Sequence, residues 1–223
     1  MSRKIPVWIP PRGKYGSTIY EDYSPKLKRI VRSYSSLERD HFVLVETAPQ
    51  IIDFCEQCER IQGVVNGELV ESIIDYWLLY ADGTEVYREI KYSADLQPSS
   101  KKFGKALRQI SAQKEYCSRN SYNHEVFTDE NIRDKRLLIT NLRFLIPFGR
   151  DERRCKEAEK LVLKELMKFE QLSIYKLYKN INYNEESLKY AVYYLLYKRR
   201  LQADLDNQPL GPRTEVRLCQ NQE

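Results

Sequence analysis

Hydrophobic periodicity divides the first two thirds of the chain into helices and strands. After Ser35-Ser36, Leu37, Phe42 and Val45 recur at helical spacing, and serine is a residue type that caps helix N-termini. Segments rich in Ile, Val, Tyr and Trp then alternate loosely, as strands do. A helix, three strands, a helix and a strand in this order are typical of a mixed sheet with a crossover helix, so we expect an α/β fold. The predicted ranges are a helix over 37–45, a strand over 50–65, a hairpin over 73–91, a helix from Ser99 to Arg119, a strand over 124–127 and a helix or strand over 137–146.

The crossover helix, which we expect Ser99 to cap, is amphipathic. Gln113 and Lys114 are expected on its surface. The residues at helical spacing, expected to face the core, are Phe103, Ala106 or Leu107, Ile110 and Cys117.

The last third of the chain has a different pattern. Pro147-Phe148-Gly149-Arg150-Asp151 interrupts the periodicity and is predicted to be a linker. Three helices are predicted to follow. The first covers 155–169, the second runs from a Ser173 cap to Lys179, and the third begins after an Asn184 cap. Two short strands then flank a Pro/Gly turn. Three helices and a β-ribbon are typical of a winged helix. The predicted domains are a basic N-terminal arm (1–34), an α/β domain (35–149) and a winged-helix C-terminal domain (150–223).

The hairpin over 73–91 holds the most informative residues of the chain. Asp82-Gly83 between its two arms is a strong turn signal. A two-residue turn would place Asp75 opposite Ile90, so that Asp75 and Glu89 would point to opposite faces. A three-residue turn over 81–83, with a left-handed glycine, pairs Asp75 with Glu89 instead. We predict the three-residue turn.

Asp75, Glu89 and Lys91 together suit metal-dependent cleavage of phosphodiester bonds. Glu89 and Lys91 are two apart on a strand and share a face, while Ile90 points into the core and its backbone carbonyl is within reach of a metal at the sheet edge. Mg²⁺ takes one or two carboxylates, waters and phosphate oxygens. Such an ion activates water, and a nearby lysine can orient or deprotonate that water. In the alternative interpretation, Asp75 merely begins a strand, and Glu89 and Lys91 lie on a solvated face.

Composition describes a soluble, mildly basic protein. Its 223 residues are 42% hydrophobic and 31% charged, with a net charge of +5. No apolar run approaches the roughly 20 residues of a membrane span, and the N-terminus lacks a signal-peptide core. The five cysteines are an odd number without secretory context, so we expect reduced structural thiols in a cytoplasmic protein.

Basic residues gather in two parts of the chain. The first 33 residues carry eight Lys/Arg against two acids and are broken by Pro and Gly, which predicts either an extended arm along phosphates or a disordered solubilising tail. Residues 155–200 carry ten Lys/Arg against six acids, interleaved with tyrosines that suit phosphate contacts, a small core or a protein-docking face. The candidate nucleic-acid-binding residues are Arg12, Lys14, Lys26, Lys28, Arg29, Lys189, Lys198, Arg199 and Arg200.

Five segments carry a family resemblance: Ser36–Asp40, Ile52–Gln57, Asp75 with Glu89–Lys91, Tyr122–Arg133 and Asn141–Leu145. In this order and spacing they resemble the TnsA family, the endonuclease subunit of heteromeric Tn7-like transposases. The resemblance covers about residues 20–218. It implies a restriction-endonuclease-like catalytic domain, with a mixed sheet and flanking helices, followed by the winged-helix domain.

The resemblance also implies roles for individual residues. Glu38, Asp75 and Glu89 are expected to surround Mg²⁺, for which Mn²⁺ can substitute, and Lys91 is expected to assist the attacking water. Spacing alone does not single out Glu38, because its helix must pack across the sheet for the carboxylate to arrive. One departure is visible, since Ile74 precedes Asp75 where many restriction-type cores have proline.

The family role implies a division of labour. This subunit would cut the non-transferred (5′) strand at transposon ends in cut-and-paste transposition, while a partner DDE-type transposase cuts and joins the other strand. The winged-helix domain would engage a AAA+ ATPase regulator as well as DNA. Two other functions stay open: a stand-alone restriction or junction-resolving nuclease, and a non-catalytic DNA-binding adaptor of the transposition complex.

Overall fold

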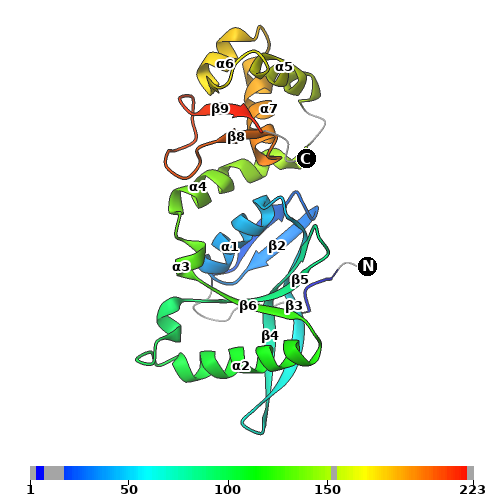
Figure 1. The fold of residues 1–223 in the computed structure, drawn as a ribbon, viewed down its shortest axis with the longest axis vertical. Helices are drawn as coiled ribbons and strands as arrows, with labels where there is room; N and C mark the ends of the chain where they lie inside the picture. Colours follow the sequence, from blue (N-terminus) through cyan, green and yellow to red (C-terminus); the bar gives the residue numbers. More distant parts are fainter. Residues whose placement is uncertain (1–3, 8–17, 152–154, 220–223) are drawn as a thin grey trace. The chain divides into compact units, whose positions relative to one another are not determined.

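Two compact units make up the chain in the computed structural model (Figure 1). The structure describes residues 4–7, 18–151 and 155–219. The first unit ends at Asp134 and the second begins at Lys135. The segment predicted as a linker, around Pro147-Phe148-Gly149, forms the 3₁₀ helix η2 (Ile146–Arg150) within the second unit.

A four-stranded mixed sheet forms the centre of the first unit. The strand order is β3-β4-β5-β6, with β5 and β6 parallel and the other pairs antiparallel. Helix α2 (Phe103–Arg119) makes the crossover between the two parallel strands (Figure 1). The predicted mixed α/β arrangement is confirmed, and it is consistent with a restriction-endonuclease-like fold. The strands are β3 (Ile51–Val65), β4 (Glu68–Tyr80), β5 (Glu85–Lys91) and β6 (Asn123–Thr128).

Helices flank this sheet. Helix α1 (Ser36–Thr47) contacts β3 and β5, and the Ser35 side chain accepts a hydrogen bond from the Glu38 backbone N–H, which confirms the predicted cap. The short helix α3 (Asp129–Ile132) follows β6 and contacts α1. A 3₁₀ helix, η1 (Ser93–Leu96), precedes α2.

The cap predicted for α2 is wrong. The helix begins at Phe103, and the residue before it, Lys102, makes no side-chain cap hydrogen bond. Ser100 rather than Ser99 is engaged here, because its hydroxyl accepts from the Lys102 backbone N–H at 3.2 Å. Leu107, offered as a core residue, is 50% exposed, so Ala106 is the residue of that pair that faces the core.

The N-terminal arm predicted over residues 1–34 contains regular structure that the sequence analysis missed. Strands β1 (Tyr20–Ser24) and β2 (Arg29–Ser33) form an antiparallel hairpin. Leu27 and Val31 are buried, so this segment has its own apolar anchors despite its basic charge. Arg12 and Lys14 lie outside the described residues.

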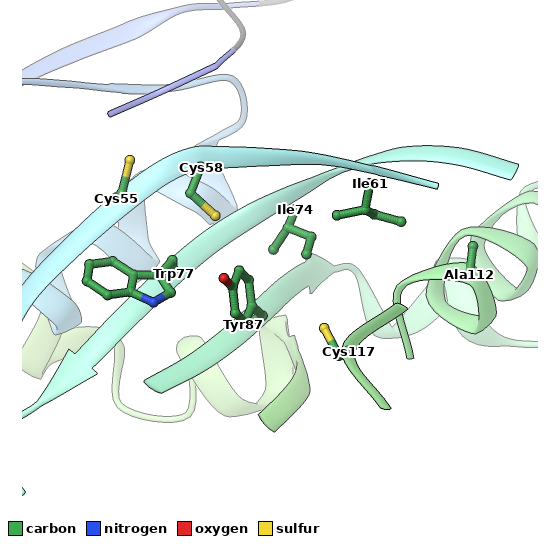
Figure 2. Close-up of a cluster of buried hydrophobic side chains, with 8 residues drawn as sticks. All are labelled: Cys55, Cys58, Ile61, Ile74, Trp77, Tyr87, Ala112 and Cys117. Atoms are coloured by element: carbon green, nitrogen blue, oxygen red, sulfur yellow. The ribbon is translucent and has the colours of Figure 1, made fainter. Parts of the chain in front are cut away.

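Apolar residues and free thiols from β3, β4, β5 and α2 form a buried cluster (Figure 2). Gly63 on β3 lies directly against the α2 backbone, since a Cβ atom at this position would lie 2.2 Å from the Ala112 carbonyl oxygen. All five cysteines are free, as predicted, and only Cys219 is exposed. The cluster consists of Cys55, Cys58, Ile61, Ile74, Trp77, Tyr87, Ala112 and Cys117.

The second unit is a helical bundle with a small antiparallel sheet of order β7-β9-β8. Ser173 and Asn184 cap α6 and α7 through their side chains, as predicted. The range 137–146, left open as helix or strand, is helical: residues 137–145 lie in α4, and Ile146 begins η2. Helix α5 ends before Phe169, which is 44% exposed. The elements are α4 (Arg136–Leu145), α5 (Lys156–Leu166), β7 (Leu172–Ser173), α6 (Ile174–Asn180), α7 (Glu185–Tyr197), β8 (Leu201–Ala203) and β9 (Glu215–Leu218). Within the described residues, the structure contains no helix long and apolar enough to cross a membrane.

Candidate active site

The β4–β5 hairpin adopts the register that a catalytic site requires. Tyr80 and Thr84 close a three-residue loop, in which Gly83 has φ +86°. Tyr76 lies opposite Arg88, and the same register brings Asp75 opposite Glu89. The predicted turn and pairing are therefore confirmed.

Asp75 is held by hydrogen bonds to both of its oxygens. Its Oδ2 accepts from the Ile90 backbone N–H at 2.8 Å, and its Oδ1 accepts from Gln57 Nε2 at 3.1 Å. Gln57 lies in the irregular stretch of β3 between Glu56 and Glu59 and has φ +45°. This bulge aims the Gln57 side chain at the carboxylate. The Ile90 side chain is buried, as predicted.

Glu89 is a completely buried carboxylate surrounded by donors. Its Oε1 accepts from Lys91 Nζ and from Gln109 Nε2 at 2.7 Å, and its Oε2 accepts from Gln113 Nε2 at 2.7 Å. Burial and the negative charge of Asp75 nevertheless raise the pKa of Glu89 to about 8. Removal from water therefore outweighs the favourable contacts with Lys91 and Gln113.

The predicted surface position of Gln113 is wrong, because its side chain is completely buried. Besides Glu89, its Nε2 donates to Ser72 Oγ at 2.9 Å, and its Oε1 lies 3.1 Å from His124 Nε2. Burial, followed by the charge of Lys114, lowers the pKa of His124 to about 4, so its ring is neutral near pH 7. The sequence did contain a signal for Gln113, since it shares a helical face with Ala106, Ile110 and Cys117.

Glu38 reaches the same site from the first turn of α1. Its carboxylate accepts from the Tyr34 backbone N–H at 2.9 Å and from the Ser35 hydroxyl at 3.0 Å. Burial and the charge of Asp75 raise the pKa of Glu38 to about 7. The structure therefore brings Glu38 and Glu89 each close enough to Asp75 for its charge to raise their pKa values.

Lys91 supplies the positive charge among these three acids. Burial lowers the pKa of Lys91, but Glu89, Asp75 and Glu38 together raise it above the ordinary value. The side chain is therefore an ammonium ion near neutral pH. Its charge offsets part of the negative charge of Glu89, to which Lys91 donates a hydrogen bond.

A cleft of about 570 Å³ opens onto the acids. Glu38 and Asp75 line it together with polar and basic groups that the sequence analysis did not select, and Gln109 links it to Glu89. Those further lining residues include Gln57, Arg60, Ser72, Lys105, Arg108 and Gln109.

The donor set suits a hard divalent cation, although its present orientation does not form a finished metal site. In the part of the chain that the structure describes, no group of three or more His, Cys, Asp or Glu side chains is arranged to hold a metal ion as it stands. Each carboxylate accepts hydrogen bonds from protein donors instead. Burial and the charge of Asp75 raise the pKa values of Glu38 and Glu89, however, and a divalent cation at the site would favour their charged forms.

Without metal, the protein is expected to lose stability as pH rises from about 5 to about 8. The pKa values of Glu38 and Glu89 are about 7 and about 8, above the ordinary value of 4.5, so the folded state holds more protons than the unfolded state over this range. The free energy of unfolding must then fall with rising pH. Thermal unfolding in EDTA measures this slope. The Glu38→Gln/Glu89→Gln variant is the control, and a wild-type slope equal to that of the variant contradicts the prediction.

The candidate DNA-binding residues of the first unit are largely engaged within the protein. Lys26 Nζ donates to the backbone carbonyls of Val45, Ala48 and Ile51 at 2.7–2.9 Å, and burial lowers the pKa of Lys26 to about 8. Arg29 forms a two-pronged ion pair with the buried Glu56, at 2.6 and 2.7 Å. Lys28 is exposed at the β1–β2 turn.

In the second unit, the candidate DNA-binding residues differ in how exposed their side chains are. Lys189, Lys198 and Arg200 are exposed, whereas Arg199 is half-buried and burial lowers its pKa. Arg200 lies 3.6 Å from Glu159.

Two of the interleaved tyrosines complete the core. Tyr193 and Tyr194 are buried, and the Tyr193 ring packs edge-on against Phe144 with ring centres 5.1 Å apart. Tyr190 and Tyr197 are half-buried. The small-core interpretation is therefore confirmed for Tyr193 and Tyr194.

Comparison with known proteins agrees with the geometry of the site. Residues 48–129 match the family model described as TnsA-like endonuclease N terminal. The matched range contains Asp75, Glu89 and Lys91, while Glu38 precedes it. None of the curated proteins compared with the chain matches it. The match over residues 48–129, together with the hairpin that it contains, supports the assignment of this chain to a TnsA-like family.

Proposed function

We propose that this chain is a Mg²⁺-dependent DNA endonuclease that cuts the non-transferred (5′) strand at transposon ends, as one subunit of a cut-and-paste transposase. The family match supports a nuclease related to Tn7 transposition and implies a DNA substrate. The observation that carries the proposal is the convergence of Glu38, Asp75, Glu89 and Lys91 beside an open cleft.

The residues of the chain divide the chemical work between them. Asp75, Glu38 and Glu89 would hold Mg²⁺, which supplies Lewis acidity and a water of lowered pKa. Lys91, charged near neutral pH, offsets the negative charge that develops on the scissile phosphate. Gln113 and Gln109 fix the rotamer of Glu89.

The second unit is proposed to be the winged-helix domain. Its order of α5, β7, α6, α7, β8 and β9, with the three strands in one antiparallel sheet, supports this. Exposed Lys189, Lys198 and Arg200 would contact DNA or an acidic partner surface. The partners proposed are a DDE-type transposase and a AAA+ ATPase regulator.

A strand-resolved cleavage assay tests the function. The full chain is incubated with DNA carrying a transposon end, labelled separately on each strand, with and without the partner transposase. We expect cutting of the non-transferred strand in Mg²⁺ or Mn²⁺ and none in EDTA, with the partner required, because the resemblance places catalysis within a complex. Cutting of only the transferred strand, or cutting that persists in EDTA, contradicts the proposal.

The same assay separates the two other functions. Efficient cutting of DNA by the chain alone would identify a stand-alone restriction or junction-resolving nuclease. A folded protein that binds DNA but takes up no Mg²⁺ in calorimetry would be a non-catalytic adaptor.

A further inference from the structure

We propose that the basic wall of the active-site cleft, formed by Arg60, Lys105 and Arg108, binds the phosphates of the DNA strand next to the scissile bond. This inference rests on the proposed nuclease function and adds to it the path of the substrate. None of the three residues belongs to the basic arm or to the winged-helix candidates. All three line the cleft that Glu38 and Asp75 also line.

The strand pairing puts one of these cations within a short distance of the acids. Arg60 on β3 pairs with Ile73 on β4, and Ile73 is two residues before Asp75 on the same strand. At a rise of roughly 3.3 Å per residue, this separation is about 7 Å along the strand. Successive phosphates of one DNA strand advance about 3.4 Å along the helix axis. The basic wall therefore begins close enough to Asp75 to contact phosphates that neighbour the scissile bond.

Helix α2 supplies the rest of the wall and connects it to the acids. Lys105, Arg108 and Gln109 occupy its first two turns and line the cleft. Gln109 donates to Glu89, so the same helical surface contacts the catalytic carboxylate and carries the cations. A strand that follows this surface would pass from the acids to the arginines without leaving the cleft.

The cations are held loosely enough to exchange partners. Arg60 lies 3.9 Å from Glu71, with side chains 55% and 57% exposed, and Arg108 pairs with Glu68, with side chains 51% and 69% exposed. Exposed pairs of this kind contribute about 0–1 kcal/mol. Phosphate oxygens match the planar arginine head as well as carboxylates do, so DNA can displace the glutamates. For Lys105, the described residues offer no ion pair at all.

Glu68 and Glu71 then compete with DNA for the same arginines. Their removal should strengthen DNA binding, whereas removal of the cations should weaken it. The size of these effects distinguishes the two cases. On a merely solvated charged surface, each change would alter binding only as much as an equal change in net charge elsewhere on the protein.

Fluorescence anisotropy with a short labelled duplex, in EDTA and over a range of salt concentrations, tests the path. For Arg60→Ala/Lys105→Ala/Arg108→Ala we expect the slope of log K against log salt to become shallower by about 2–3, at about 0.9 per phosphate contact. The control is Lys101→Ala/Lys102→Ala/Lys114→Ala, which removes the same charge at exposed positions outside the cleft lining. Its slope should stay near that of the wild type. Equal slopes for the two triple variants overturn the inference.

Two further variants complete the test. Glu68→Gln/Glu71→Gln should bind the duplex more tightly than the wild type, and unchanged or weaker binding overturns the inference. If the cleft triple variant fails to fold, as judged by thermal unfolding, Lys105→Ala alone should still lower the slope by about 0.9.

Failure of this inference is distinguishable from failure of the proposed function. Binding is measured without metal, so a chain that binds through the cleft but never cuts DNA leaves the path intact and refutes the function. If the wild-type chain cuts DNA normally, and the cleft triple variant binds and cuts DNA as well as the wild type does, only the proposed phosphate path is refuted.

Discussion

Replacement of Asp75 by asparagine is expected to abolish metal-dependent DNA cleavage, with a loss of about 10³-fold or more in the single-turnover rate. Asparagine keeps the size of the side chain and one oxygen. That oxygen can accept the hydrogen bond that the Ile90 backbone N–H donates to Asp75 Oδ2 at 2.8 Å in the wild type. The substitution removes the negative charge that would bind Mg²⁺. A bound metal ion stabilises the charge that develops on the reacting phosphate by several kcal/mol. Single-turnover cleavage in the reconstituted complex measures the effect.

The Asp75→Asn experiment has a matched control on the same hairpin. Asp82 lies in the exposed turn and accepts from the Thr84 backbone N–H, so Asp82→Asn should cleave like the wild type. Assembly and DNA binding of Asp75→Asn should be intact. Because the charge of Asp75 helps to raise the pKa values of Glu38 and Glu89, the variant should also flatten the loss of metal-free stability with pH. Wild-type-like cutting by Asp75→Asn would disprove the proposed site.

Replacement of Lys91 by alanine is expected to lower the cleavage rate by about 10²–10⁴-fold, the range typical of a positioned charge or proton-transfer group. Lys91 donates to the buried Glu89, so its loss also leaves that carboxylate without its cation. The pKa of Glu89 should then rise further, because Lys91 lowers it at present. Mg²⁺ binding, measured by calorimetry, should weaken near pH 7 and recover partly at higher pH, since the ligand must lose its proton first.

Two comparisons identify the origin of the Lys91 effect. If Lys91→Ala still cuts more slowly than the wild type at saturating Mg²⁺ and raised pH, the remaining loss of rate reflects the missing positive charge next to the phosphate. Lys114→Ala removes an exposed lysine from α2 and should leave both the rate and the Mg²⁺ affinity unchanged. A Lys91→Ala enzyme that recovers full activity at high pH would limit Lys91 to preparing Glu89 for the metal.

The hairpin could be predicted from sequence because its information is local. Asp82-Gly83 and the apolar arms set the turn, and the turn alone determines whether Asp75 faces Glu89. The helix caps at Ser35, Ser173 and Asn184 are local in the same sense, since each depends on one side chain and the turn that follows it.

Residues brought to the site by tertiary packing could not be found in this way. Glu38 reaches Asp75 from a helix 37 residues earlier in the chain, and only the resemblance to a family pointed to it. Gln113 was expected at the surface because its side chain is polar. Its spacing from Ala106, Ile110 and Cys117 places it on the buried face of α2 instead. Arg60 and Lys105 belong to different elements, and only the packing of α2 on the β3–β4 hairpin places them along one cleft.

The missed β1–β2 hairpin shows the opposite error. Proline, glycine and positive charge at the N-terminus suggested an irregular arm, yet buried Leu27 and the exposed turn at Lys28, with φ +56°, are sufficient to form two short strands. Charge composition averaged over 33 residues concealed a local apolar pattern.

The missing side chain of Gly63 allows helix α2 to lie directly against strand β3. Since a Cβ atom there would lie 2.2 Å from the Ala112 carbonyl oxygen, any substitution must shift the backbone of β3 or of α2. Lys105, Arg108 and Gln109 lie on that helix and Arg60 lies on β3, so such a shift would change the spacing of the residues that line the cleft. The close approach of the two elements thus contributes to the width of the cleft, and a substitution at Gly63 offers a way to alter that width without replacing Glu38, Asp75, Glu89 or Lys91.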